Sequence, residues 1–312
     1  MIKKVFIDGS AGTTGLRIAE RLESRADIEL IKLSEENRKD LNARKEALNK
    51  ADIAFLCLPD AAAIEAVSLI ENDKTVVLDT STAHRTNSDW AYGFPELSAQ
   101  AEEKIKASKR IAVPGCHASG FISLIYPLVE EGIINKDVLL SCTSLTGYSG
   151  GGKKMIAEYE NTDRDVLLSS PRQYGIAQQH KHLPEMTAVT GIKNAPAFIP
   201  IVADFYSGME VTVPLFASQL NKGFTVEDIK RVYKCKYQGP VVKYIDNFDE
   251  SGFVASNKLS FKDSMEISVS GNEDRILLIS RYDNLGKGAS GAAVECMNIV
   301  LGVSKTTGLD II

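Results

Sequence analysis

Short apolar runs alternate with amphipathic stretches through the first third of the chain. Five runs have the length of buried strands: Lys3–Asp8, Ile28–Leu33, Ile53–Leu58, Thr75–Asp79 and Arg110–Val113. Helical spacing between them predicts helices over Thr14–Ser24 and Ala61–Glu71. In the first of these helices one face is predicted to carry Leu16, Ala19 and Leu22. Strands that alternate with helices predict parallel βαβ units, and hence an α/β fold with a doubly wound parallel sheet.

The pattern changes after Cys116. A helix is predicted over Ala118–Glu131, and a strand-rich region follows it: Val138–Gly147, Ala197–Asp204, Met209–Phe216, Met265–Gly271 and Asp274–Tyr282. Further helices are predicted from Pro184, over Glu227–Lys236 and over Ser290–Leu301. Because several of these strands are direct neighbours along the chain, we expect a second α+β domain with a mixed or antiparallel sheet.

The length of the chain indicates two domains. At 312 residues it exceeds the size at which one hydrophobic core stops growing. The change of pattern at Cys116 and the helical texture of the tail place one domain over residues 1–115 plus 286–312, and the other over residues 116–285.

Composition narrows the class of partner. An apolar fraction of 44% with 25% charged residues is that of an ordinary globular protein. The net charge of −5 gives no basic surface for nucleic acid and no attraction to an anionic membrane. The apolar stretch Val5–Ile7 is too short for a signal peptide, and no run reaches the roughly 18 residues of a membrane span. We therefore expect a cytoplasmic protein that acts on small molecules.

A glycine-rich loop joins the first predicted strand to the first predicted helix. It comprises Gly9, Ser10, Ala11, Gly12, Thr13, Thr14 and Gly15. Glycines in this position let the backbone approach a pyrophosphate, and the helix N-terminus supplies N–H groups and a positive dipole end. The setting predicts a dinucleotide-binding, Rossmann-type domain. The spacing is G-x-x-G-x-x-G rather than G-x-G-x-x-G, so a tight turn without a ligand is the alternative.

In such domains the residues at the end of the second strand determine whether NADP or NAD is bound. Glu35 would suit the ribose hydroxyls of NAD, whereas Ser34, Arg38 and Lys39 would suit the 2′-phosphate of NADP. The segment favours NADP without deciding it. A charged surface loop is the alternative.

One cysteine stands apart from the other four. The five cysteines are scattered, odd in number and without a C-x-x-C pair, which argues against a zinc site or a disulfide framework. Four lie in apolar segments and are expected to be buried: Cys57, Cys142, Cys235 and Cys296. Cys116 instead follows Pro114 and Gly115 at the start of a predicted helix, where the dipole lowers the pKa of a thiol and backbone N–H groups can hold an oxyanion. We interpret it as a nucleophile.

Two histidines and a carboxylate could serve that nucleophile. His180, His182 and Glu185 lie where a polar loop enters a helix at Pro184. With no third histidine or cysteine nearby they make a poor zinc set, so no metal is expected. A base oriented by a carboxylate is the better chemical interpretation, and which histidine acts is open. An exposed polar loop is the alternative. His117 is ranked low as the base because an adjacent helical side chain points about 100° away.

Two further segments could bind an anion. Arg85, which follows His84 after a strand end, has the planar fork that suits a carboxylate or phosphate. Ser149–Lys154 is a second glycine-rich turn that ends in Lys153 and Lys154, and its backbone N–H groups could cradle an anion. Taken alone, either segment is more often plain loop chemistry.

Seven stretches in order along the chain together resemble the N-acetyl-γ-glutamyl-phosphate reductase family in its shorter form. They are Gly9–Gly15 (GSAGTTG), Ser81–Arg85 (STAHR), Tyr92–Leu97 (YGFPEL), Pro114–Gly120 (PGCHASG), Gly147–Lys154 (GYSGGGKK), His180–Glu185 (HKHLPE) and Asp283–Ala293 (DNLGKGASGAA). The resemblance extends to the wider class of aspartate-semialdehyde and glyceraldehyde-phosphate dehydrogenases.

The resemblance implies an activity and a set of roles. The family reduces N-acetylglutamyl 5-phosphate to the 5-semialdehyde and phosphate in arginine biosynthesis, with NADPH and through a cysteine thioester. The first domain would bind NADP, and the second would hold the catalytic residues and the dimerisation surface of a dimer or tetramer. Cys116 matches the nucleophile, and His180 or His182 matches the acid–base, with Glu185 nearby. Arg85, Tyr148 and Lys153 fall in segments that line the substrate pocket, and Asn284 and Gly288 in the stretch toward the nicotinamide.

Three other functions remain as alternatives. An aspartate-semialdehyde dehydrogenase would share the chemistry but prefer aspartyl phosphate. A cysteine hydrolase using Cys116 and His182 would have no use for the glycine loop. A non-catalytic NADP(H) sensor would keep the Gly9–Gly15 loop but would have no use for Cys116.

Overall fold

The computed structural model describes residues 2–312, which divide into two compact units. Unit 1 comprises residues up to Gly115 together with residues 289–309, and unit 2 comprises Cys116–Gly288 with Asp310–Ile312. Unit 1 holds a parallel sheet with helices and unit 2 a mixed sheet, which confirms the predicted fold class. Within residues 2–312 no helix is both long and apolar enough to cross a membrane.

The sheet of unit 1 is six-stranded, in the order β2-β1-β3-β4-β6-β5, and every strand pair is parallel. Its strands are β1 (Lys3–Asp8), β2 (Ile28–Ile31), β3 (Ile53–Leu56), β4 (Val76–Asp79), β5 (Ala91–Tyr92) and β6 (Arg110–Ala112). The helices are α1 (Thr13–Glu23), α2 (Leu41–Lys50), α3 (Asp60–Ser68), α4 (Ala99–Ala107) and α9 (Gly291–Leu301). The chain passes from β1 to β2 on one side and then crosses to β3 on the other side of β1, so the loop after β1 lies at a topological switch point, where such sheets bind ligands.

Two hydrophobic cores cover the two faces of this sheet. On one face Ile18 of α1, Ile105 of α4 and Met297 of α9 pack on the strands. On the other face the packing comes from α2 and α3, with Leu48 and Ala63. The strand interiors are buried on both sides, which explains why they are continuous apolar runs rather than alternating ones.

The sequence reasoning missed two helices of unit 1 and placed the face of a third only in part. Helices α2 and α4 were not predicted, because their sequences are mostly polar and each buries few apolar residues. The buried face of α1 was predicted only in part: Leu22 is buried as expected, but Leu16 is 44% exposed and the helix buries Gly15 and Ile18. Burying Gly15 brings the helix backbone against the glycine loop, and this rotates Leu16 outward.

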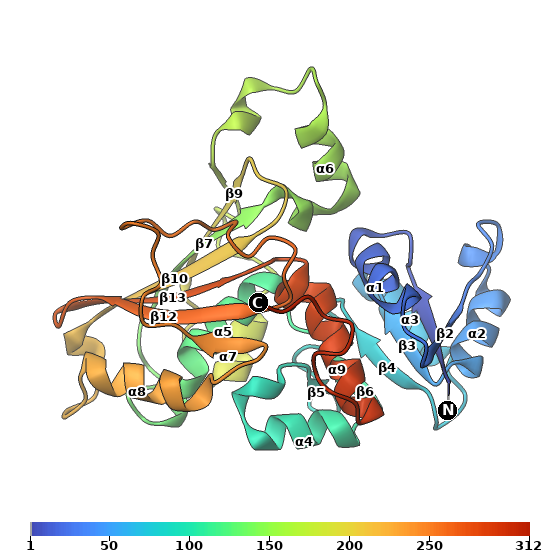
Figure 1. Ribbon diagram of the computed structural model, residues 1–312, viewed down its shortest axis with the longest axis horizontal. Coiled ribbons are helices and arrows are strands. Elements are labelled where there is room, and N and C mark those ends of the chain that lie inside the picture. The colour runs from blue at the N-terminus through green and yellow to red at the C-terminus, as the bar shows by residue number, and fades with distance from the viewer. Residues whose placement is uncertain (1) are drawn as a thin grey trace. The chain divides into compact units, whose positions relative to one another are not determined.

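Unit 2 is built on a seven-stranded mixed sheet in the order β11-β12-β13-β10-β7-β9-β8. Its strands are β7 (Ser141–Gly147), β8 (Arg172–Gln173), β9 (Ala197–Ala203), β10 (Met209–Phe216), β11 (Val242–Tyr244), β12 (Met265–Gly271) and β13 (Arg275–Tyr282). One face is covered by α5 (Cys116–Glu130), α7 (Leu183–Thr190) and α8 (Val226–Lys236), as Figure 1 shows. Helix α5 packs on β10 and β13, which places its first turn over the middle of the sheet.

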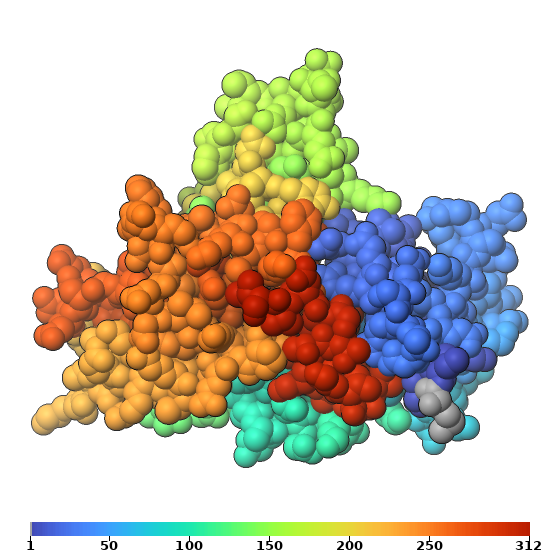
Figure 2. Space-filling model, viewed as in Figure 1, coloured from blue at the N-terminus to red at the C-terminus, as the bar shows by residue number. Residues whose placement is uncertain are grey.

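The opposite face of this sheet stays partly exposed. Strand alternation directs Leu145, Ile199 and Ile201 to that face, and none of the three is fully buried. Leu277 on the same face is 39% exposed. A second exposed region of unit 2 is the segment around α6 (Gly152–Glu160), coloured yellow-green, which stands out from the rest of the unit in Figure 2.

Candidate active site and nucleotide loop

Cys116 is the first residue of α5, a 15-residue helix. The helix begins two residues before its predicted start at Ala118, so the thiol lies in the first turn, where the positive end of the dipole acts. Its neighbours approach closely: a Cβ placed on Gly288 would lie 3.1 Å from the Cβ of Cys116. Gly288, predicted near the nicotinamide, therefore lies directly against Cys116.

The other cysteines are not arranged for catalysis. Cys142 and Cys296 are buried, and burial raises the pKa of Cys57 to about 12. Cys235 is exposed, so its predicted burial is wrong. It lies on α8 away from the helix face that carries the buried Ile229 and Tyr233.

His117 forms the centre of a polar cluster behind Cys116. Its Nδ1 lies 2.7 Å from the hydroxyl of Ser144 on β7, and its Nε2 lies 2.6 Å from the hydroxyl of Tyr174. Burial, followed by the charges of His180 and Lys181, lowers the pKa of His117 to about 3. The ring is therefore neutral at physiological pH and links α5 to the sheet through hydrogen bonds rather than charge.

Both predicted acid–base histidines join this cluster. The ring centroid of His117 lies 5.5 Å from that of His180 and 5.6 Å from that of His182. The backbone N–H of His182 donates to Nδ1 of His180 across 3.2 Å, and burial lowers the pKa of His180. Both rings are thereby brought beside the residue that follows Cys116, because α7 packs against α5.

Glu185 lies in the first turn of α7 and is buried. The four residues predicted to be catalytic thus all lie in unit 2: Cys116 on α5, Glu185 on α7, and His180 and His182 in the loop that enters α7. In the described part of the chain, residues 2–312, no three His, Cys, Asp or Glu side chains converge in a geometry that could hold a metal ion.

Tyr174 is a site residue that the sequence reasoning missed. Burial raises its pKa, with a second contribution from Cys116, so the phenol is neutral and close enough to the thiol to interact with it. It stands beside β8 (Arg172–Gln173), six residues before His180. Its position in the polar loop that ends at His180 was the one available signal.

The predicted substrate residues of unit 2 surround the second glycine-rich turn. Tyr148 stacks on Tyr159, with ring centroids 4.6 Å apart, and burial raises its pKa. Lys153 is exposed near the start of α6. Asn284 is buried, and its amide donates to Ser149 and accepts from the N–H of Gly208. Its side chain therefore fastens the glycine-rich turn to a neighbouring loop.

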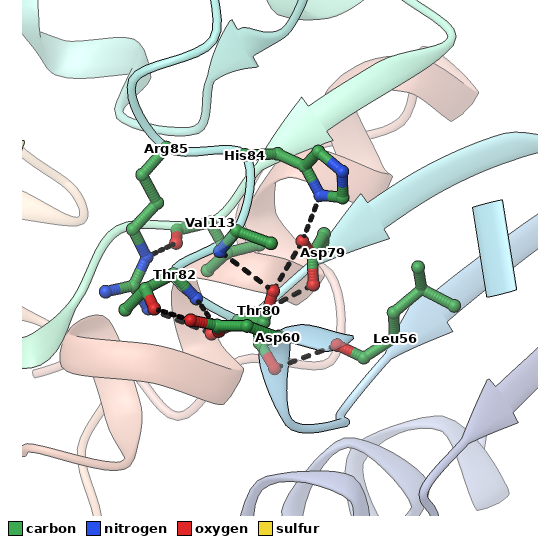
Figure 3. Close-up of polar contacts among 10 residues, drawn as sticks. Leu56, Asp60, Asp79, Thr80, Thr82, His84, Arg85 and Val113 are labelled. Atoms are coloured by element: carbon green, nitrogen blue, oxygen red, sulfur yellow. Dashed lines mark hydrogen bonds and ion pairs between the residues drawn. The ribbon is translucent and has the colours of Figure 1, made fainter. Parts of the chain in front are cut away.

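Arg85 lies in unit 1, at the carboxyl ends of β4 and β6 (Figure 3). Its guanidinium donates to the carbonyl oxygens of Val113 and Thr80, across 2.9 and 2.8 Å. The preceding residue, His84, holds the buried Asp79 through its Nδ1 at 2.6 Å and stacks on Trp90. The loop that presents Arg85 is thus fixed by a buried imidazole–carboxylate pair at the end of β4.

The glycine loop of unit 1 has two glycines that the fold requires and one that it does not. Gly9 has φ +86°, and a Cβ there would lie 2.3 Å from a backbone oxygen. A Cβ on Gly15 would lie 2.5 Å from the Gly9 oxygen, whereas one on Gly12 would meet a single atom at 3.4 Å. The space beside Gly12 is open to a ligand.

Polar groups around the same loop suit an anion. Gly12 caps α1 without a side-chain hydrogen bond, so no side chain covers the N–H groups of the first turn. The hydroxyl of Thr13 is buried without a hydrogen-bond partner. These features fit the pyrophosphate of a dinucleotide.

The loop after β2 places Ser34 and Arg38 together. The Ser34 carbonyl accepts from the N–H of Arg38, and the Arg38 guanidinium pairs with Glu35 at 3.1 Å. Strand β2 is parallel to β1, so this loop and the glycine loop leave the same edge of the sheet. The two rival predictions, Glu35 and Arg38, therefore form one ion pair on the surface.

Two family models match the chain. One, described as semialdehyde dehydrogenase, NAD binding domain, matches residues 4–106, and one described as semialdehyde dehydrogenase, dimerisation domain, matches residues 116–284. The fold and these matches define an oxidoreductase of the semialdehyde dehydrogenase class with a nicotinamide-cofactor domain. Curated N-acetyl-gamma-glutamyl-phosphate reductases from Brucella ovis and Brucella melitensis are 42% identical over 309 residues, covering 97% of this chain and 100% of each relative. The chain belongs to the N-acetyl-gamma-glutamyl-phosphate reductase family.

Solved structures agree on the fold. Aspartate semialdehyde dehydrogenase II from Vibrio cholerae, complexed with ASA, has a TM-score of 0.74 at 16% identity, covering 97% of this chain and 99% of that one. Aspartate semialdehyde dehydrogenase with NADP from Candida albicans has a TM-score of 0.65 at 15% identity, covering 98% and 100%. At these identities the likeness concerns architecture alone. The curated relatives therefore favour the N-acetylglutamyl reductase over the aspartate-semialdehyde alternative.

Proposed function

We propose that this protein reduces N-acetylglutamyl 5-phosphate to N-acetylglutamate 5-semialdehyde and phosphate, in arginine biosynthesis, through a thioester on Cys116. The observation that supports it most is the position of Cys116 in the first turn of α5, beside a cluster of three imidazoles. A thiol in that position has a helix dipole to favour its thiolate and a base within the same unit.

The chain's own groups supply the acyl chemistry. The Cys116 sulfur attacks the acyl carbon, and phosphate leaves with the electrons of the broken C–O bond, so that a thioester forms. Backbone N–H groups of the α5 first turn stabilise the oxyanion as it develops. His180, whose pKa is lowered by burial, or His182 takes the thiol proton. The same imidazole returns a proton when the hemithioacetal collapses to aldehyde and free thiol.

The proposed cofactor is NADPH, which when bound supplies the hydride that reduces the thioester. Gly9, Ser10, Ala11, Gly12, Thr13, Thr14 and Gly15 would bind its pyrophosphate, which the open space beside Gly12 and the unpartnered Thr13 hydroxyl support. Ser34 and Arg38 would bind the 2′-phosphate, with Arg38 exchanging its Glu35 partner for the ligand. Asn284 and Gly288 would lie toward the nicotinamide.

We assign the remaining roles by unit. Unit 1 would bind the nucleotide, and unit 2 would hold the catalytic residues and the dimerisation surface. Arg85, Tyr148 and Lys153 would contact the anionic substrate, and Glu185 would orient the acid–base histidine.

The proposed oligomer is a homodimer formed through the partly exposed sheet face of unit 2. That face carries apolar side chains, among them Leu145, Ile201 and Leu277, and it belongs to the segment that matches the dimerisation-domain model. A second copy placed on it would bury these side chains.

The test is an assay of the purified protein for phosphate-dependent NADP⁺ reduction, with N-acetylglutamate semialdehyde beside aspartate semialdehyde. We expect turnover with the first aldehyde and none with Cys116→Ala, which should still bind NADPH. Comparable turnover of aspartate semialdehyde would replace the proposed substrate, and near-native activity of Cys116→Ala would remove the nucleophile.

A further inference from the structure

We infer that Tyr282 is a positioning residue for Cys116, because its hydroxyl clamps the first turn of α5 to strand β13. The hydroxyl donates to the carbonyl oxygen of Cys116 across 2.6 Å. It also accepts from the backbone N–H of Gly120 across 3.0 Å. In a regular α-helix the N–H of residue i+4 donates to the carbonyl oxygen of residue i, and Gly120 and Cys116 stand in that relation. The tyrosine hydroxyl therefore bonds to both groups of the first helical hydrogen bond of α5.

The clamp (Tyr282, the Cys116 carbonyl and the Gly120 N–H) is buried and neutral. Tyr282 is fully buried, and burial raises its pKa well above the ordinary value, so the hydroxyl keeps its proton and can donate. A buried hydroxyl that donates one hydrogen bond and accepts another is held in a single orientation, so the clamp is rigid.

The packing around the clamp leaves no room for a side chain at Gly120 or for one at Gly288 without displacement of a neighbour. A Cβ on Gly120 would lie 2.6 Å from the Tyr282 hydroxyl and 2.7 Å from the hydroxyl of Ser280. A Cβ on Gly288 would lie 3.1 Å from the Cys116 Cβ and 3.4 Å from the Tyr282 ring. Gly120 thus lets the tyrosine hydroxyl reach the helix backbone, and Gly288 lets the loop after β13 pack directly against Cys116.

The position of the clamp gives it a catalytic consequence. First turns of helices fray, and the backbone of Cys116 would otherwise be free to move with its own helix end. Tying that carbonyl to a central strand fixes the sulfur relative to the sheet, which also holds Ser144 and, through it, His117. A small displacement of a reacting atom lowers the rate of the chemical step strongly. Loss of the clamp should therefore lower kcat and leave KM almost unchanged.

The same helix offers a matched control. Tyr237 donates its hydroxyl to the carbonyl oxygen of Ser123 on α5 across 2.6 Å and is also buried. Tyr237→Phe therefore removes the same kind of bond from the same helix, two turns away from Cys116. In Tyr282→Phe the Cys116 carbonyl and the Gly120 N–H can still pair with each other, so the fold should persist.

The experiment compares Tyr282→Phe, Tyr237→Phe and the native enzyme. It measures kcat and KM with N-acetylglutamate semialdehyde, and separately the rate at which iodoacetamide alkylates Cys116, followed by peptide mass spectrometry. The inference rests on the proposed function only in taking Cys116 as the nucleophile. The alkylation rate needs no substrate, so a wrong substrate assignment would remove the turnover of the native enzyme and leave the alkylation comparison intact.

We expect Tyr282→Phe to lower kcat by about tenfold with KM within about twofold, and to slow alkylation, at a melting temperature close to that of Tyr237→Phe. Gly120→Ala should reproduce the loss of kcat, because its methyl group displaces the tyrosine hydroxyl. Equal kcat and alkylation rates in Tyr282→Phe and Tyr237→Phe would overturn the inference.

Discussion

Gly12 is a glycine that neither the backbone conformation nor the surrounding protein requires, and this points to a ligand beside it. Its backbone angles, φ −76° and ψ 165°, are open to any residue, and a Cβ there would be tolerated by the protein around it. Gly9 and Gly15, by contrast, are required by the turn itself. A glycine with no local need is best explained by what must approach its backbone.

We therefore predict that Gly12→Ala folds normally but binds NADPH at least about tenfold more weakly, since the methyl group occupies the space of the pyrophosphate. Fluorescence titration gives the dissociation constant, and thermal unfolding gives the stability. Gly15→Ala is the contrast, because it should lower the melting temperature. Unchanged NADPH affinity in Gly12→Ala would mean that the loop is only a turn.

Arg38 tests the choice of dinucleotide. The guanidinium is exposed and held by Glu35, so it is available to a 2′-phosphate at little structural cost. Arg38→Glu should weaken NADPH by about tenfold or more while leaving NADH almost unchanged, because only the former has the extra phosphate. Parallel titrations with the two dinucleotides measure this. Equal losses would show that the 2′-phosphate is bound elsewhere.

At the scale of elements, His117 connects a helix, a strand and a loop. Its two ring nitrogens reach Ser144 on β7 and Tyr174 next to β8, so the catalytic cluster depends on an imidazole that must stay neutral. Its pKa is about 3 in the folded protein and about 6.5 in the unfolded chain. Between these values the unfolded chain binds the additional proton.

The free energy of unfolding should therefore fall as the pH drops below about 6.5, by up to about 1.4 kcal/mol per pH unit from this residue. Urea unfolding at a series of pH values measures the slope. In His117→Gln the slope between pH 6 and pH 4.5 should be shallower, whatever the variant's stability at neutral pH. An identical slope in both proteins would contradict the assignment of a buried neutral ring.

The same elements show what sequence alone could and could not give. Strands were predicted from local pattern: β1 contains a buried apolar run, and β10 alternates buried with more exposed positions. Helix α2 was missed because its buried side includes Arg44, whose burial is possible only through ion pairs with Asp8 and Glu65. The roles of His117 and Tyr282 depend on contacts across 57 and 166 residues, which no local pattern reveals.

For the whole molecule, the open sheet face of unit 2 is the feature that a lone subunit leaves unexplained. If a second copy covers it around a two-fold axis, a charge introduced there faces its own like charge across the interface. We predict that Leu145→Glu converts the dimer into monomers. Ile64→Glu is the control, because Ile64 is also exposed but lies on α3 of unit 1.

Sedimentation velocity at micromolar concentration distinguishes the two species. If Leu145→Glu still sediments as a dimer, the interface lies on another surface. If the native protein sediments as a monomer, the proposed dimer does not exist.

The central claim is that an acyl group resides on Cys116 during the reaction. It is tested most directly by mixing the protein with N-acetylglutamate semialdehyde and NADP⁺ in the absence of phosphate, where the thioester has no acceptor. We predict a burst of NADPH of about one per subunit and an N-acetylglutamyl mass on the peptide that contains Cys116. No burst, or an acyl group on another residue with Cys116 unmodified, would contradict the account.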